Sequence, residues 1–332
     1  MLRKLGAYLR LIRPAQWIKN VFVFGAFVFW ANSASREDLL PAFVHTAEAF
    51  VVFCLLSGAV YAFNDLRDYR EDRLHPTKCR RPVASGAVSP AEAGTMAVLL
   101  AAIGIIVSIK IAQPLAVTAV AYLVLNLFYS LWGKHCVLLD VILISIGFVM
   151  RALAGAQAIP VDVSAWLVIC TFTLCLFLGF GKRRCEIAAF DSNGKAASHR
   201  STLAAYTPEL LTQLLSTTGG IAVITFLLYT LDPKTPSPHS MVFTTPLVFY
   251  AIFRYATVIS RGQLTGPTDI LINDRPFLVT ALLWTGMTLA LVFAGERIEK
   301  YLPRLRYPGE TPAVVVPHQH PLTSPGVPSV RR

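Results

Sequence analysis

Four polar side chains that follow an apolar run ending at Phe63 have the types and spacing of a divalent-metal site. Asn64, Asp65, Asp68 and Asp72 form the pattern N-D-x-x-D-x-x-x-D. If the helix of that run continues past Phe63, offsets of three and four residues place the aspartates on one face. Mg²⁺ prefers carboxylate oxygens and commonly bridges to substrate phosphates. The motif therefore predicts a Mg²⁺–diphosphate site, with Mn²⁺ as an alternative metal.

Bases on the same helix offer a simpler interpretation of this motif. Arg67, Arg70 and Arg73 could neutralise the acids through pairs such as Arg67–Glu71. Those pairs would cover Glu71 but leave the three aspartates without a matching cation on their face. Stacked like charges repel one another, so we favour the metal site.

A second group of bases follows on a predicted loop. Pro76 and Pro82 end the helix, so the side chains between them can fold back over the acids. Lysine and arginine donate charge-assisted hydrogen bonds to phosphate oxygens. We expect Lys78 and Arg81 to bind the phosphates of the same ligand.

The rest of the chain has the composition of an integral membrane protein. Charged residues make up 15% of its 332 residues, against about 25% in soluble proteins, and the mean hydropathy is +0.56. Apolar runs long enough to cross about 30 Å of hydrocarbon recur along it. We predict an all-α, polytopic membrane protein with about nine transmembrane helices around a central polar cavity. The predicted spans are 17–34, 42–63, 90–112, 114–132, 136–157, 163–181, 208–231, 241–260 and 276–295.

Lysine and arginine are distributed unevenly between the two sides of this topology. The amino terminus and alternate loops hold 20 of the 30, whereas the opposite loops hold only Arg36 and Lys234. By the positive-inside rule, the acidic motif and the mouth of the cavity face the cytoplasm, and we expect the plasma membrane as the location. The net charge of +11 follows from this bias and from attraction to anionic lipid or substrate. Nucleic acid is not needed as a partner.

Three motifs, in order, resemble those of the UbiA superfamily of intramembrane prenyltransferases. They are RPAQWIKN at 13–20, the acidic motif after the second span, and YSLWGKH…LDVILISIGFVMRALAG within 129–155. The resemblance covers about residues 10 to 295 and implies the fold of that superfamily. We therefore expect a transferase domain over 1–302, followed by a Pro-rich tail over 303–332 that is predicted to be disordered.

The segment after the sixth span departs from the superfamily pattern. Relatives that use prenyl diphosphates carry a second acidic motif there, D-x-x-x-D, whereas this chain has GFGKRRCEIAAFD. Lys182, Arg183 and Glu186 stand in place of the acids. A basic cluster beside the membrane, with a Lys182–Glu186 ion pair, is the simpler interpretation. Bases at this position would also suit a phosphate that carries no metal.

Four segments resemble the branch of the superfamily that transfers a phosphoribosyl group from phosphoribosyl diphosphate (PRPP) to a polyprenyl phosphate. They are HPTKCRRPVASG at 75–86, GKRRCE at 181–186, FRYA at 253–256 and GPTDILINDRP at 266–276. The resemblance implies that Mg²⁺ and the acids hold the diphosphate, and that bases hold the 5′-phosphate. A decaprenyl-like lipid phosphate would attack C1 of the ribose, in the synthesis of an arabinose donor for the cell envelope.

The same resemblance assigns roles to the other polar residues. The predicted catalytic residues are Asp65, Asp68, Asp72, Lys182 and Glu186. The predicted substrate-binding residues are Lys19, Asn64, Lys78, Arg81, Tyr129, Lys134, Arg151, Lys182, Arg183 and Glu186. Within this set Glu186 would bind ribose hydroxyls, and Lys19, Tyr129, Lys134 and Arg151 would hold the lipid phosphate or line the cavity.

Two of these charges also have plain structural explanations. A charge inside a span is a functional candidate, which applies to Arg151, but a pair with Asp140 would equally explain it. Asp274 and Arg275 are expected to pair with each other at the mouth of the last span.

Two other functions remain open from the sequence. One keeps the superfamily but transfers a prenyl group to an aromatic acceptor; the absence of the second acidic motif counts against it. The other is an ion or phosphate transporter, although transporters place coupling charges near the middle of the membrane and show repeated halves. The sequence also leaves open whether the chain forms a homo-oligomer.

Overall fold

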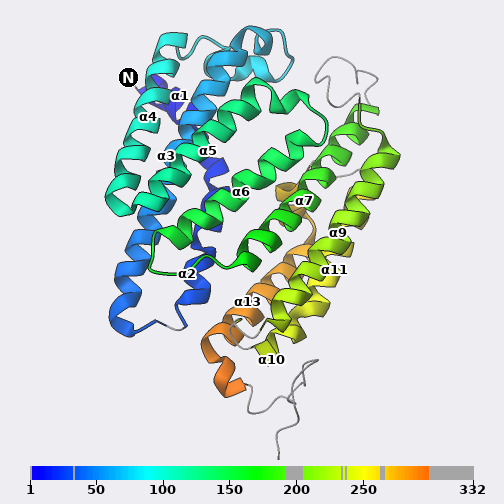
Figure 1. Ribbon diagram of the computed structural model, residues 1–332. Helices are drawn as coiled ribbons and strands as arrows, with labels where there is room; N and C mark the ends of the chain where they lie inside the picture. Colours follow the sequence, from blue (N-terminus) through cyan, green and yellow to red (C-terminus); the bar gives the residue numbers. More distant parts are fainter. Residues whose placement is uncertain are drawn as a thin grey trace, which may run out of the picture.

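The computed structural model describes residues 2–32, 34–191, 205–232, 235, 238–261 and 266–298 (Figure 1). These residues form α-helices and 3₁₀ helices joined by turns, with no strand among them. The predicted tail at 303–332 lies outside the described residues. The longer helices are α3 (Arg36–Asp72), α4 (Pro90–Ile111), α5 (Gln113–Leu131), α6 (Leu139–Gln157), α7 (Ala165–Asp191), α9 (Pro208–Leu231), α11 (Thr245–Ser260) and α13 (Arg275–Ile298). The short elements are α1 (Leu2–Ile12), η1 (Pro14–Phe24), α2 (Gly25–Trp30), η2 (Lys78–Arg80), η3 (Gly133–His135), α10 (Pro238–Met241), η5 (Val242–Thr244) and α12 (Pro267–Asn273).

Eight of the helices in the described part of the chain are long and apolar enough to cross a membrane. They correspond to the last eight predicted spans. The first predicted span, 17–34, differs, because it consists of the 3₁₀ helix η1 followed by one short α-helix, α2. A 3₁₀ helix rises about 2.0 Å per residue, so η1 and α2 together would still extend roughly 30 Å. A ninth crossing therefore stays a prediction.

The helix boundaries follow local sequence signals. Ser89 and Glu92 form a reciprocal capping box at the start of α4, and Pro90 occupies its first turn. Thr207 caps α9 by accepting a hydrogen bond from the amide of Leu210. Such caps satisfy backbone groups that a helix end would otherwise leave unpaired.

Two helices extend past the ends of their predicted spans. Helix α3 continues from Phe63 to Asp72, so the acidic motif is helical as its spacing required. Helix α7 does not stop at Gly181 but continues to Asp191, which places the basic motif on a helix as well. Both motifs therefore lie on rigid extensions of apolar helices.

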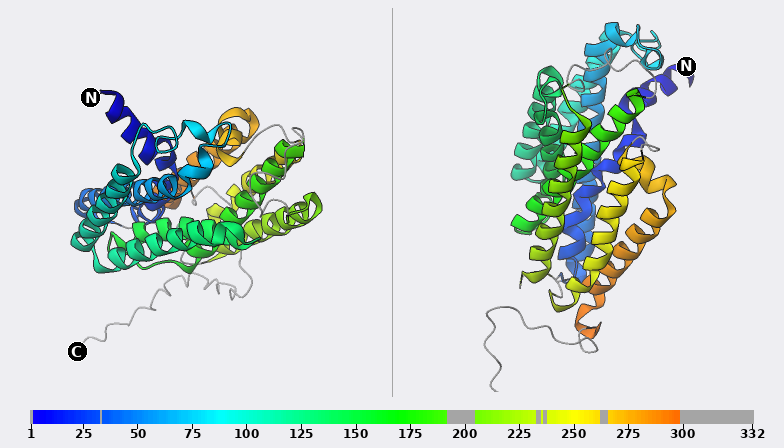
Figure 2. Two further views of the ribbon diagram at one scale, coloured as in Figure 1. Left: turned by 90° about the horizontal axis from the view of Figure 1, so that it is seen from above. Right: turned by 90° about the vertical axis from the view of Figure 1, so that its right-hand side faces the viewer.

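The helices form two groups that lie side by side, α1 to α6 and α7 to α13 (Figures 1 and 2). Each group has its own buried apolar cluster, the first on η1, α3, α5 and α6, the second on α7, α9, α11 and α12. The groups meet where α6 packs on α7. They meet again where Phe29 of α2 packs against Met241, Leu291 and Val292. Apolar contact of α2 with α10 and α13 thus joins the two groups at a second place.

The backbone of η1 lies directly against α6 at one glycine. A Cβ atom added to Gly155 would overlap the carbonyl group of Val23. Because the obstacle is backbone on a second helix, no side-chain rotation could relieve the overlap. Gly155 is therefore required for the close approach that carries η1 past α6.

We predict that Gly155→Ala destabilises the protein by about 3 kcal/mol, the upper end of the usual cost of overpacking. Thermal unfolding of the detergent-purified protein measures the effect. Gly220→Ala is the matched control, because nothing lies within 4 Å of a Cβ atom at that helical glycine. Equal melting temperatures for the two variants would contradict the packing argument.

Candidate active site

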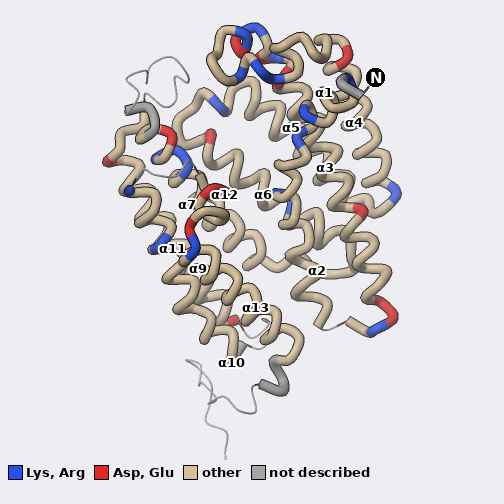
Figure 3. Tube along the Cα trace, turned by 180° about the vertical axis from the view of Figure 1, so that it is seen from behind, with Lys and Arg blue, Asp and Glu red and all other residues tan. Residues whose placement is uncertain are grey.

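Many of the charged residues lie toward one end of the helix bundle (Figure 3). This end carries α1, the last turns of α3 and the loop that follows, residues 73–89. Near it lie the basic extension of α7 and the short helix α12. The two motifs that the sequence predicts as substrate-binding thus lie toward the same end of the fold.

Two of the motif's aspartates share a cation. Arg13 Nη2 lies 2.5 Å from Asp65 Oδ1, and Arg81 Nη1 lies 2.7 Å from Asp72 Oδ2. The same Arg81 nitrogen is 3.9 Å from Asp65 Oδ1. Asp65 and Asp72 therefore face the same space, as their spacing of seven residues predicts.

The other two motif residues contact the end of α5 and the segment that links it to α6. Lys134 Nζ donates to both carboxylate oxygens of Asp68, at 3.0 and 3.1 Å. Ser130 donates a hydrogen bond of 2.5 Å to the side-chain oxygen of Asn64. Lys134, which the sequence predicts to hold the lipid phosphate or line the cavity, therefore contacts the acidic motif directly.

The bases of α3 itself do not match the three aspartates: Arg67, Arg70 and Arg73 bond elsewhere among the described residues, as expected. Bases from three other segments reach this face instead, namely Arg13, Lys134 and Arg81, which folds back from the loop as predicted. Long-range pairs of this kind leave no trace in helical spacing. Charge neutrality at this end of α3 is therefore a product of the tertiary fold.

The donor set fits a hard divalent cation. Asp65 is 1% exposed, and its second oxygen, Oδ2, is buried without a hydrogen-bond partner among the described residues. A buried carboxylate oxygen in that state favours a cation. Within the described residues no three acidic, histidine or cysteine side chains converge on one point. Mg²⁺ does not need that, since it is typically held by one or two carboxylates with water and phosphate oxygens.

Arg13 is a site residue that the sequence reasoning missed. It joins α1 to η1 with φ 52° and ψ 64°, a left-handed conformation that is uncommon outside glycine. Its guanidinium also lies over the ring of Tyr61, 4.9 Å from the centroid. The sequence feature that could have identified Arg13 is its position at the start of the motif RPAQWIKN.

The basic motif on α7 contains a buried arginine between two carboxylates. Arg183 Nε is 2.8 Å from Asp140 Oδ2, and Arg183 Nη1 is 2.5 Å from Glu186 Oε2. The side chain of Arg183 is 4% exposed, whereas that of Lys182 is 51% exposed, with its ammonium 3.9 Å from Glu186. Lys182 is therefore accessible to a ligand, and Arg183 acts as the structural counter-ion of Asp140.

Tyr206 completes this cluster and was also missed. It donates a 2.8 Å hydrogen bond to Asp140 and accepts one of 2.7 Å from the amide of Leu138. Burial is the main cause that raises the pKa of Tyr206 far above its ordinary value, and the bond to Asp140 adds to it. The phenol therefore remains a donor at neutral pH. It ties the segment before α9 to the start of α6.

Arg151 does not pair with Asp140, contrary to the structural explanation offered above. It donates to Asn20 at 2.8 Å, to Tyr122 at 2.7 Å and to the carbonyl of Gly147 at 2.7 Å. These partners are neutral, so none of them is a counter-ion for the buried guanidinium. Asn20, from the motif RPAQWIKN, is a third residue that the sequence reasoning missed.

Lys19 lies between the two charged clusters. It is close enough to Lys182, Arg151 and Arg13 to be affected by their charges. It makes no hydrogen bond or ion pair within the described residues, although its side chain is half-buried. A half-buried ammonium next to other cations favours an anion as its partner.

Two other predicted substrate-binding residues, Lys78 and Tyr129, lie near residues of the site. Lys78 lies in η2, three residues before Arg81, and Tyr129 lies next to Ser130 at the end of α5. Tyr129 is near enough to Arg183 to interact with its charge.

The predicted Asp274–Arg275 pair was wrong. Asp274 instead forms a bidentate pair with Arg254 of α11, at 3.0 and 2.7 Å. It also accepts a hydrogen bond from the amide of Phe277, which caps α13. The hydrogen bond from Arg254 lowers the pKa of Asp274. The pair therefore anchors the start of α13 to α11.

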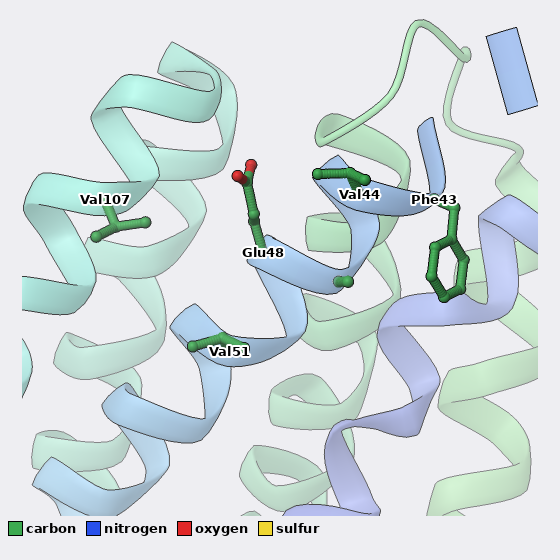
Figure 4. Close-up of a pocket in the computed structure, with 6 residues that line it drawn as sticks. Phe43, Val44, Glu48, Val51 and Val107 are labelled. Carbon is green, nitrogen blue, oxygen red and sulfur yellow. The ribbon is translucent and has the colours of Figure 1, made fainter. Parts of the chain in front are cut away.

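A groove between α3 and α4 lies away from these charges (Figure 4). Its lining residues are Phe43, Val44, Ala47, Glu48, Val51 and Val107. Glu48 precedes Asp65 by 17 residues along α3, or about 25 Å at the helical rise. Its carboxylate pairs with His45 at 3.2 Å. The groove is therefore not part of the candidate active site.

Comparisons with known proteins identify the family of this chain. The sequence model of the UbiA prenyltransferase family matches residues 21–272. The chain is 32% identical to a decaprenyl-phosphate phosphoribosyltransferase of Mycolicibacterium smegmatis, over 86% of this chain and 92% of the relative. It is 33% identical to the enzyme of the same name from Corynebacterium glutamicum, over 86% of each chain.

Solved structures show the same fold. A UbiA homologue from Archaeoglobus fulgidus bound to GPP and Mg²⁺ has a TM-score of 0.65 at 20% identity, covering 87% of this chain and 99% of that chain. A digeranylgeranylglyceryl phosphate synthase has a TM-score of 0.61 at 17% identity, covering 88% and 98%. The family favours an enzyme over the transporter hypothesis. The chain is a multi-pass membrane transferase that belongs to the UbiA prenyltransferase family.

Proposed function

We propose that this transferase moves the 5-phosphoribosyl group of PRPP to a polyprenyl phosphate and releases diphosphate, with its active site facing the cytoplasm. The observation that carries the proposal is the chemistry of α7. The exposed residue of its basic motif GKRRCE is a base, Lys182, and the acid four residues later, Glu186, is paired with two bases. This end of the site therefore suits a phosphate that carries no metal. The similarity to decaprenyl-phosphate phosphoribosyltransferases supports the same donor.

The acidic face of α3 would hold the diphosphate of PRPP. Asp65, Asp68 and Asp72 would carry Mg²⁺, and Asn64 would contribute an amide oxygen. When bound, the metal would neutralise charge on the leaving diphosphate. Arg81 and Lys78 lie on the adjoining loop, from which they would donate to its oxygens.

The 5′-phosphate would then lie toward α7, across the ribose from the diphosphate. Lys182 would donate to it, and Glu186 would accept hydrogen bonds from ribose hydroxyls. Arg183 would hold Glu186 in position, because it already contacts that carboxylate and is itself fixed by Asp140. Lys19 would attract the lipid phosphate into the space between the two motifs, with Arg151 behind it.

The chemistry demands little proton transfer from the protein. A phosphate monoester is anionic at neutral pH, so it can attack C1 without a general base. The transition state would be oxocarbenium-like, as in other glycosyl transfers. Orientation of the two substrates and stabilisation of the departing diphosphate would carry most of the rate enhancement.

The direct test is to incubate the detergent-purified protein with labelled PRPP, Mg²⁺ and a polyprenyl phosphate. We expect a lipid product that carries the label, and equimolar diphosphate. Turnover of a prenyl diphosphate with an aromatic acceptor, and none of PRPP, would instead support aromatic prenyl transfer.

Asp68→Asn should lower turnover by about a hundredfold or more, because it removes charge from the metal site while preserving shape. Steady-state rates measure the loss, and the melting temperature reports folding. Glu71→Gln is the matched control, since it removes one acid from an exposed position on the same helix. Wild-type turnover in EDTA without added metal would contradict the assignment.

Lys182→Ala should raise KM for PRPP about ten- to a hundredfold, since a hydrogen bond to a charged group contributes about 1.5–3 kcal/mol. KM for the lipid phosphate should change less. Arg184→Ala removes the same charge two residues away, on another side of α7, and should leave both values near wild type. An unchanged KM for PRPP in Lys182→Ala would mean that the basic motif only orients the protein in the membrane.

Arg183→Ala should differ from Lys182→Ala by destabilising the fold. The substitution removes the counter-ion of the buried Asp140 carboxylate. Breaking a buried ion pair costs about 3–5 kcal/mol of folding stability. Thermal unfolding should show the loss even without substrate. The double variant Arg183→Leu with Asp140→Leu should recover part of that stability, because no charge remains unpaired. A melting temperature equal to wild type for Arg183→Ala would contradict the structural role of Arg183.

A further inference from the structure

Each aspartate of the acidic motif is paired with a base from a different part of the chain. Arg13 comes from the junction of α1 and η1, Arg81 from the loop after α3, and Lys134 from η3. The three acids and three bases balance in charge. This set differs from a simple metal site, because each carboxylate that would bind the metal already contacts a lysine or an arginine.

This charge balance makes it unfavourable for a metal ion or a diphosphate to bind alone. A divalent cation that enters alone competes with these bases for the carboxylates, and a base that it displaces then has no counter-ion in a partly buried site. A diphosphate that enters alone meets the carboxylates and is repelled. When both enter together, the aspartates can bind the metal while the bases bind the phosphate oxygens.

We propose that Arg13, Arg81 and Lys134 are exchangeable counter-ions, which leave the aspartates for the diphosphate when metal and diphosphate bind together. This inference rests on the proposed function only in placing a diphosphate at α3. It makes Arg13 a substrate-binding residue. It also predicts that metal and diphosphate bind with strong positive coupling, and that the metal alone binds weakly.

The geometry at Asp65 is suited to such an exchange. One carboxylate oxygen contacts Arg13, while the other is buried and without a partner in the described part of the chain. The side chain of Arg13 is 30% exposed, whereas that of its partner Asp65 is 0% exposed. Arg13 can therefore turn outward to a ligand, whereas Asp65 stays in place. Arg81 already lies between two carboxylates, at 2.7 and 3.9 Å, and needs only a small shift.

The test uses Arg13→Gln with Mn²⁺ and inorganic diphosphate as probes. The electron paramagnetic resonance signal of free Mn²⁺ reports binding without any turnover. Removing the counter-ion frees Asp65, so Mn²⁺ alone should bind about tenfold more tightly, while Mn²⁺–diphosphate should bind about tenfold or more weakly. These opposite shifts are the signature of exchange.

Arg70→Gln is the matched control, because it removes a base from the same end of α3 that contacts Tyr69 and no aspartate. Both affinities should stay within about twofold of wild type. Should Arg13→Gln fail to fold, Lys134→Gln provides the same test at Asp68, with the same two shifts expected.

The outcomes separate this inference from the proposed function. If Mn²⁺ and Mn²⁺–diphosphate affinities fall together in the folded variants, or if neither changes, exchange is wrong even where PRPP is the donor. If the shifts are opposite but the enzyme uses a prenyl diphosphate, exchange stands and the proposed donor fails, since both donors carry a diphosphate.

Discussion

Neutralisation of charge at the edge of an apolar solvent is the constraint on which this structure depends. A carboxylate or guanidinium near hydrocarbon is stable only with a partner of opposite charge or a full set of hydrogen bonds. Asp65, Asp140 and Arg183 are almost fully buried, and each forms an ion pair with a residue from another segment. These pairs therefore bind the ends of the helices to one another while they build the site.

The two charged motifs differ in how that neutrality is arranged. On α3 the acids are the helix's own and the bases come from elsewhere, so a cation can replace the bases. On α7 the buried arginine is the helix's own and Asp140 comes from α6, which leaves Lys182 exposed. Under the proposed function, one side would hold a metal-bound diphosphate and the other a phosphate without a metal.

Rigid supports hold these motifs. Both lie on turns that continue transmembrane helices. The packing of each long helix therefore fixes the position of the motif's side chains. The segment η1 runs between them and brings in Arg13, Lys19 and Asn20. It can do so only because Gly155 of α6 lets its backbone pass at close range. The close packing of η1 on Gly155 therefore determines the positions of these three polar residues.

Local and compositional features were determined by the sequence alone. The apolar runs predicted the helices because helix formation and burial in lipid depend on neighbours within a few turns. The spacing of Asp65 and Asp72 predicted a shared face for the same reason, and motif resemblance identified the family before any geometry was known.

The pairing of charges was decided only by the tertiary structure. Arg13 meets Asp65 across 52 residues, and Tyr206 meets Asp140 across 66. No periodicity encodes such contacts, because they depend on how whole helices pack. The predicted Asp274–Arg275 pair failed for that reason: sequence proximity suggested it, whereas packing of α11 against α13 brought Arg254 to Asp274 instead.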